Sequence, residues 1–140
     1  MSDTHISNAA AIDANDAIID LLDADASAGY LRIYDDGAAQ PSSVDDGVPA
    51  GSTMLAEHTL SDPAFGDSSD ANPGAEATAN SINDATAAAD GTALWFRAFD
   101  GAGTAIIDGD VSADGGGGDL QLNSTSISSG ATVSITGWTF

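Results

Sequence analysis

The sequence predicts a mainly β fold: an antiparallel β-sandwich or small barrel of about seven strands that follows an N-terminal amphipathic helix. Two observations lead to this prediction. Apolar residues recur at helical spacing in residues 8–23, whereas from residue 30 onward short alternating apolar runs are separated by Gly, Asp, Asn, Ser and Pro. We therefore expect residues 1–29 to form a helix that packs on the domain or on a neighbouring subunit, and residues 30–140 to form the β domain.

The helix has recognisable ends, because Ser7 or Asn8 can cap its start and Gly29 lies shortly beyond its end. Four aspartates share one stripe at spacing i, i+3, i+7 and i+10: Asp13, Asp16, Asp20 and Asp23. The remaining broad arc holds the large apolar residues: Ile12, Ile18, Ile19, Leu21 and Leu22. This arrangement predicts that the apolar arc is the side the helix buries.

The β domain is predicted strand by strand. We expect strands near residues 30–35, 53–60, 92–99, 103–111, 119–122 and 131–140, and a weaker one within 76–89. Residues 100–103 predict a hairpin turn, and 36–52 and 61–75 are long polar connections. Residues 111–119 read as a flexible loop. The aromatic C-terminus, with Trp138 and Phe140, is expected to pack on the domain or on a neighbour.

The charge of the chain excludes some partners. It has 22 acidic residues, 20 of them Asp, but only two Arg and no Lys, which gives a net charge of −20. Such a surface repels phosphate and anionic lipid, so neither nucleic acid nor a membrane is expected as a partner. The hydrophobic content of 42% is too high for a disordered acidic tail. We interpret the acidity as adaptation to a saline interior; an ordinary acidic surface is the alternative.

The two arginines have similar surroundings. Arg32 lies between Tyr30 and Tyr34, and Arg97 lies between Trp95 and Phe99. Positions two apart on a strand share a face, so each guanidinium can lie over its aromatic neighbours and can pair with a carboxylate of an adjacent strand. A structural role in the sheet and a role in anchoring a partner subunit or an anionic ligand both remain open.

The residues offer little for catalysis. His58 follows Glu57 on a predicted strand, so the two point to opposite faces and form no dyad. The sequence has no G-x-S-x-G motif, no phosphate-binding loop and no cysteine, so we expect neither an enzyme nor a thiolate metal site.

The loop around residues 108–119 is the one place where a cation is considered. It supplies four candidate ligands, Asp108, Asp110, Asp114 and Asp119, but their spacing fits no EF-hand. We therefore expect no cofactor, with Ca²⁺ or another salt cation as a weak alternative.

Four segments resemble a family of small virion structural proteins of tailed viruses. They are YLRIY at 30–34, LAEHTLSDPAFG at 55–66, WFRAFDG at 95–101 and LQLNSTSI at 120–127, preceded by the helix. Together they span most of the chain. The resemblance implies a virion component and supplies no catalytic residues. The greater acidity of this chain implies a haloarchaeal tailed virus or a phage of a halophilic bacterium.

The expected function is therefore a capsid decoration or stabilising protein that acts through protein–protein contacts. Its partners would be the major capsid protein, other virion proteins and further copies of the chain. The candidate contact residues are Ile12, Ile19, Leu22, Tyr30, Arg32, Tyr34, Trp95, Arg97, Trp138 and Phe140. Two alternatives remain: a neck or tail component, and a module whose loops 36–52, 61–75 and 111–119 bind a host glycan or receptor.

The sequence also bears on location. The N-terminus has no basic segment followed by an apolar core, and no apolar run reaches the roughly 20 residues that cross a bilayer. We expect synthesis in the host cytoplasm and assembly into the virion.

The saline interpretation predicts that the fold depends on salt. Repulsion among the carboxylates is largely screened when the Debye length falls from about 10 Å at 0.1 M to about 3 Å at 1 M salt. Stepwise dialysis from concentrated KCl to dilute buffer, followed by circular dichroism, should show progressive unfolding. A chain that keeps its full ellipticity in dilute buffer contradicts the interpretation.

Overall fold

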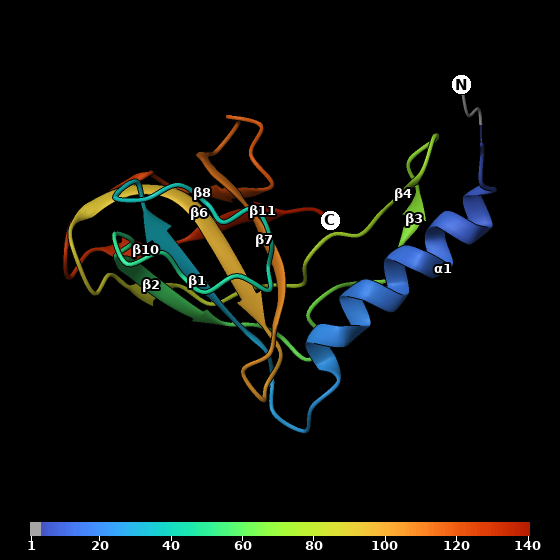
Figure 1. Cartoon of the computed structure of the whole chain (residues 1–140), viewed down its shortest axis with the longest axis horizontal. Coiled ribbons are helices and arrows are strands. Elements are labelled where there is room, and N and C mark those ends of the chain that lie inside the picture. Colours follow the sequence, from blue (N-terminus) through green and yellow to red (C-terminus); the bar gives the residue numbers. More distant parts are fainter. Residues whose placement is uncertain (1–3) are drawn as a thin grey trace.

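The computed structural model describes residues 4–140 and confirms a mainly β fold with an N-terminal helix. One strongly curled, mixed sheet forms a half-barrel, and the helix lies at its side (Figure 1). Its strands run in the order β11-β8-β7-β6-β1-β2, with β9 also pairing with β6. The bounds are β1 Tyr30–Asp35, β2 Met54–Thr59, β6 Gly91–Phe99, β7 Ala105–Ala113, β8 Leu120–Leu122, β9 Ser126–Ile127 and β11 Ile135–Trp138.

Two small sheets complete the architecture. β3 (Ser69–Asp70) pairs with β4 (Ala75–Glu76), and β5 (Ala85–Thr86) pairs with β10 (Thr132–Val133). The predicted strands within 76–89 and 131–140 thus correspond to short pieces. The predicted hairpin at 100–103 joins β6 to β7, which pair antiparallel.

The sequence predicted an antiparallel sheet, and this prediction is wrong at one strand pair. β7 and β8 pair in parallel, with Val111 opposite Leu120. The short glycine-rich connection between them turns the chain back so that β8 runs alongside the end of β7. Gly115 and Gly117 have φ of 77° and 83°, a backbone conformation that side chains disfavour. The run of glycines therefore serves this tight return.

The helix α1 (Asn8–Ile19) begins at Ser7, whose side chain accepts a hydrogen bond from the N–H of Ala10, as predicted. It continues into one 3-10 turn, η1 (Asp20–Asp23). Gly29 is not its cap. It lies where a Cβ would meet the carbonyl oxygens of Phe99 and Leu22, so it permits close packing of the chain beside β6.

The predicted orientation of the helix is wrong in part. Ile19 and Leu22 are buried, but Ile18 and Leu21 are 40% and 48% exposed. Two aspartates of the stripe turn instead toward the rest of the chain. Asp16 Oδ1 accepts a hydrogen bond from Ser68 N at 2.8 Å, and Asp23 Oδ1 accepts one from Ala64 N at 3.0 Å. These backbone donors need acceptors, and the aspartates supply them.

The core lies between the sheet, η1 and the C-terminus. On the core face of the sheet, Leu31, Ile33 and Phe96 are fully buried. The Trp138 ring contacts Phe65 and Phe96 edge to face, with ring centroids 4.6 and 5.3 Å apart. The C-terminal aromatic residue Trp138 therefore packs on its own domain.

His58 is the one buried histidine of the core face. It is 1% exposed, it lies opposite Leu31 in the β1–β2 register, and its Nδ1 is 3.0 Å from the Asn83 carbonyl oxygen. That contact assigns the proton to Nδ1. Nε2 has no hydrogen-bond partner within residues 4–140. Burial lowers the pKa of His58 below its ordinary 6.5, although the Asn83 carbonyl and the Asp84 carboxylate oppose that change.

We expect the fold to lose stability as the pH falls below about 6.5. The unfolded chain then binds a proton at His58 while the folded chain does not, so protonation favours unfolding. His58→Asn keeps a donor for the Asn83 carbonyl but does not titrate in this range. Urea unfolding between pH 8 and pH 5 at constant high salt should give a smaller decline for the variant than for the native chain. Parallel declines would contradict this prediction.

Candidate functional site

The two arginines of the chain meet on one face of the sheet. In the antiparallel β1–β6 pair, Arg32 lies directly opposite Arg97. Glu57 of β2 lies opposite Arg32 on one side, and Asp108 of β7 lies opposite Arg97 on the other. The result is a line of four charged side chains across four strands, Glu57–Arg32–Arg97–Asp108, which we call the charged row. Each arginine has a carboxylate on its outer side, which offsets the repulsion between the two guanidinium groups.

The Arg97 half of the charged row is sealed. Arg97 Nε donates to Asp108 Oδ1 at 2.6 Å and Nη2 donates to Oδ2 at 2.7 Å, so the pair is bidentate. Nη1 also donates to the carbonyl oxygen of Asp46 at 2.7 Å, and the two side chains of the ion pair are only 4% and 7% exposed. The carboxylate of Asp108 raises the pKa of Arg97 above its ordinary value.

The segment 36–52 accounts for this burial. It crosses the face of the sheet that carries the charged row (Figure 1), and the carbonyl oxygens of Ser43 and Asp46 accept hydrogen bonds from Arg97. From the sequence, this stretch was expected only to be a long polar connection. Its role as a cover was not predicted, because carbonyl acceptors leave no pattern in a sequence.

The Arg32 half of the charged row is open to solvent. Arg32 Nε donates to Glu57 Oε2 at 2.7 Å, with side chains 37% and 45% exposed. The Glu57 carboxylate raises the pKa of Arg32 above its ordinary value. The guanidinium also lies over the Tyr30 and Phe99 rings, 5.2 and 5.4 Å from their centroids. Solvent weakens such contacts, so this half of the row contributes less to stability.

Stacked aromatic pairs flank the charged row on both sides. Tyr30 stacks on Phe99 with centroids 4.7 Å apart, and Tyr34 stacks on Trp95 at 4.4 Å. Trp95 also lies under the Arg97 guanidinium, with its ring centroid 5.6 Å from Arg97 Cζ. Each arginine thus lies over one of its two predicted aromatic neighbours and pairs with a carboxylate of an adjacent strand, as predicted, but Phe99 lies under Arg32 rather than under Arg97. Three residues of β1 and three of β6 lie side by side on this side of the sheet, and we call them the arginine face: Tyr30, Arg32, Tyr34, Trp95, Arg97 and Phe99.

An aspartate ends each arginine strand and holds the turn that follows. Asp35 Oδ1 accepts from Thr53 N at 2.7 Å and Gly37 N at 3.2 Å, which closes the base of segment 36–52 and lowers the pKa of Asp35. Asp100 Oδ1 accepts from Thr104 N at 2.8 Å and Ala102 N at 3.0 Å in the β6–β7 hairpin. These contacts explain why both arginine segments continue into Asp and Gly.

The arginine face therefore has a structural role: Arg97 holds β6, β7 and segment 36–52 together. Every side-chain nitrogen of Arg97 donates to an acceptor of the chain itself. Tyr34, Trp95 and Arg97 are at most 4% exposed, so they do not reach the surface in this structure. Arg32 and Tyr30 remain partly accessible.

The helix presents the second surface of interest. Of the candidate contact residues on it, Ile19 and Leu22 are buried within the chain and Ile12 is half-buried. The accessible apolar residues are others: Ile18 and the exposed alanines of α1, and Leu21 of η1. The sequence pattern identified α1 as amphipathic but did not identify which apolar residues remain outside.

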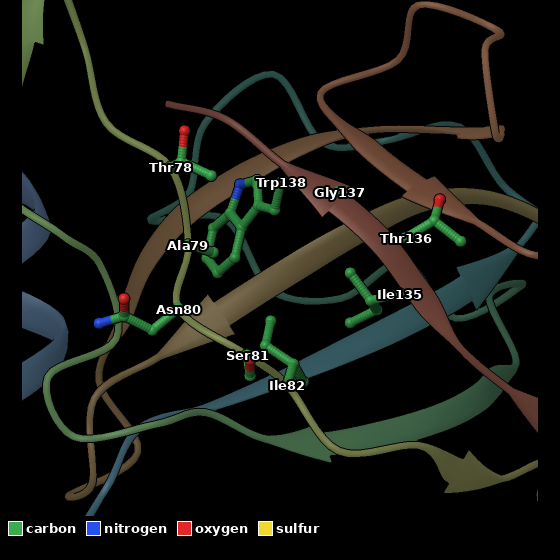
Figure 2. Close-up of a pocket in the computed structure, with 9 residues that line it drawn as sticks. All are labelled: Thr78, Ala79, Asn80, Ser81, Ile82, Ile135, Thr136, Gly137 and Trp138. Carbon is green, nitrogen blue, oxygen red and sulfur yellow. The ribbon is translucent and has the colours of Figure 1, made fainter.

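A shallow groove of about 310 Å³ lies between the segment 78–82 and β11 (Figure 2). Several polar groups of its lining are already engaged: Asn80 Nδ2 donates to the Pro63 carbonyl at 2.9 Å, and Thr136 Oγ1 lies 3.3 Å from Asp114 Oδ1. Trp138 is only 2% exposed, so it offers no ring for stacking a ligand. Phe140, half-buried, pairs its backbone with Ala77.

The candidate cation ligands are spread apart. Asp108 is bound to Arg97, and Asp114 contacts Thr136. Asp110 and Asp119 do come together, since Asp119 N donates to Asp110 Oδ1 at 2.8 Å. Burial and the Asp110 carboxylate raise the pKa of Asp119. Within residues 4–140, the acidic and histidine side chains form no group of three or more that could hold a metal ion.

We expect unequal effects from removing the two arginines. Arg97→Ala leaves the Asp108 carboxylate buried and unpaired and should cost about 3–5 kcal/mol of stability. Arg32→Ala, the matched control on the same row, removes an exposed pair and should cost about 1 kcal/mol. Urea unfolding in concentrated KCl measures both. Equal losses would show that the cover formed by 36–52 does not strengthen the Arg97 contacts.

The chain matches no protein-family model, no curated protein and no solved structure. The relation to virion proteins expected from the four segments quoted above therefore stays a prediction. In the part of the chain that the structure describes, no helix combines the length and apolar content needed to cross a membrane.

Proposed function

We propose that the protein is a structural component of a tailed-virus particle that works in concentrated salt through protein–protein contacts. Capsid decoration is the role we assign to it, with the major capsid protein and further copies of the chain as partners. The four segments that resemble virion proteins support this proposal. The proposal gives the protein no catalytic role and no cofactor.

The observation that carries the proposal is the exposed apolar side of α1 and of the 3-10 turn η1 that continues it. Ile18 and Leu21 remain 40% and 48% exposed on a chain with a net charge of −20. The helix is held by polar contacts on its other side, through Asp16, Asp23 and Asn15. A helix fixed in this way presents its apolar side to a neighbour, as an assembly protein requires.

The arginine face supports the same proposal from inside the fold. A decoration protein must keep its shape while many copies adhere to a shell. The buried pair between Arg97 and Asp108 connects β6, β7 and segment 36–52, and it is screened by salt far less than surface pairs are. The fold thus has an internal support that tolerates a saline interior.

The alternatives have less support. A neck or tail component would use the same contacts, and its copy number would distinguish it. A module that binds a host glycan would need an accessible ring or free polar groups. Segment 36–52 is engaged with Arg97, and the groove of Figure 2 offers a buried Trp138 and committed side chains.

The copy number in the particle tests the proposal. We expect quantitative mass spectrometry of particles purified in high salt to find the chain in amounts comparable to the major capsid protein. A few copies per particle would instead support the neck, tail or receptor-binding alternatives. Absence of the chain from purified particles would refute a virion role.

A further inference from the structure

The segment that covers one end of the charged row is attached to the sheet at a single place. We call residues 37–51 the strap. Asp35 Oδ1 accepts hydrogen bonds from Gly37 N at 3.2 Å and from Thr53 N at 2.7 Å, one at each end of the strap. Gly37 and Gly51 lie so close that a Cβ at Gly37 would collide with the Gly51 carbonyl oxygen. The chain therefore leaves the sheet and returns to it side by side, as in an Ω-loop.

No side chain of the strap is buried. Each residue from 37 to 51 is exposed or half-buried, and Val48 is 40% exposed. A segment that buries few apolar side chains opens at a lower free energy than the core, because its opening exposes little apolar surface of its own. The strap therefore has little hydrophobic attachment to the sheet.

Two hydrogen bonds fasten the middle of the strap to the sheet. Arg97 Nη1 donates to the Asp46 carbonyl oxygen at 2.7 Å, and Arg97 Nη2 donates to the Ser43 carbonyl oxygen at 3.4 Å. Within residues 4–140, every other hydrogen bond of residues 38–50 is local and reaches at most four positions along the chain. The strap can therefore separate from the sheet by losing two hydrogen bonds.

The closed strap leaves two polar groups without partners. Trp95 is fully buried on the covered face, and its Nε1–H has no acceptor within residues 4–140. The hydroxyl group of Ser52, where the chain leaves the strap, is also buried without a partner in that range. A buried, unpaired polar group carries a free-energy cost that water would remove. This cost brings the closed and open forms closer in free energy.

We propose that the strap opens as a unit about its base while the sheet stays folded. Opening breaks the two contacts of Arg97 with strap carbonyls but leaves its bidentate pair with Asp108. It uncovers the guanidinium together with Tyr34 and Trp95, which stay stacked on each other. These three residues, expected from the sequence to contact a partner, are at most 4% exposed while the strap is closed. The strap thus controls access to a concealed contact surface, whatever the role of the chain in a particle.

Native-state hydrogen exchange tests this inference on the unaltered chain. In concentrated KCl, the indole N–H of Trp95 is compared with backbone N–H groups of β6 at urea concentrations too low to unfold the chain. Exchange at Trp95 should be nearly independent of urea, because local opening exposes little surface, whereas exchange in β6 should accelerate with urea. Without urea, we expect the indole N–H to exchange about tenfold faster than the slowest β6 amide. Equal rates with equal urea dependence would overturn the inference.

Two glycines of the strap provide a matched pair of variants. Gly37→Ala places a Cβ against the Gly51 carbonyl oxygen and strains the closed base, whereas Gly47→Ala places one where no atom lies within 4 Å. We expect Gly37→Ala to accelerate exchange at Trp95 about tenfold further and Gly47→Ala to leave it unchanged. The indole N–H of Trp138, on the core face, is the control and should respond to neither.

The variants also separate local opening from a general loss of stability. Acceleration at Trp95 in both variants, or in neither, would overturn the inference. Equal acceleration at Trp95 and at the β6 amides in Gly37→Ala would do so too, because the whole sheet would then be opening. If Gly37→Ala does not fold, the urea series on the unaltered chain decides the question.

Discussion

The buried ion pair between Arg97 and Asp108 is the constraint on which the sheet depends. The guanidinium joins two neighbouring strands and the segment that covers them, and all of its nitrogens are satisfied by the chain itself. A buried charge without its partner is costly, so this geometry allows one register of β6 against β7. Arg32 then lies opposite Arg97, and Glu57 completes the charged row on the exposed side. The two basic residues of a chain with 22 acids are thus used at one place.

Local patterns predicted much of the fold. The alternation in 30–35 and 92–99 predicted β1 and β6. Residues 100–103 predicted the hairpin that joins β6 to β7. The contact of each arginine with a ring of its own strand followed from the rule that positions two apart share a face, whereas the contact of Arg32 with Phe99 crosses between strands and was not predicted. The pairing of Arg32 with Arg97 could not be predicted, because it joins strands that lie far apart in the chain. The parallel return of β8 beside β7 depends on the glycines of the 114–119 connection, whose backbone angles a sequence pattern does not state.

The orientation of α1 shows where hydrophobic periodicity fails. The pattern favoured burial of the whole apolar arc, but Asp16 and Asp23 accept hydrogen bonds from backbone N–H groups of the 64–68 segment. Leaving those two donors without acceptors would cost more free energy than the full burial of Ile18 and Leu21 would gain, since each lost buried hydrogen bond costs about 1–3 kcal/mol. The donors belong to a distant segment, so the helix sequence alone contains no sign of them. The candidate site was missed for this reason: the residues left outside, Ile18 and Leu21, were expected to be core.

The enclosed end of the arginine face and the acidic exterior of the chain differ in how they respond to salt. The Arg97 end of the arginine face is enclosed and responds little to ionic strength, whereas the acidic exterior is repulsive unless salt screens it. Screening of the carboxylates by salt weakens the repulsion across that exterior and so favours the compact chain. The ion pair between Arg97 and Asp108 is enclosed, so it keeps most of its strength in the same salt and continues to hold β6, β7 and segment 36–52 together.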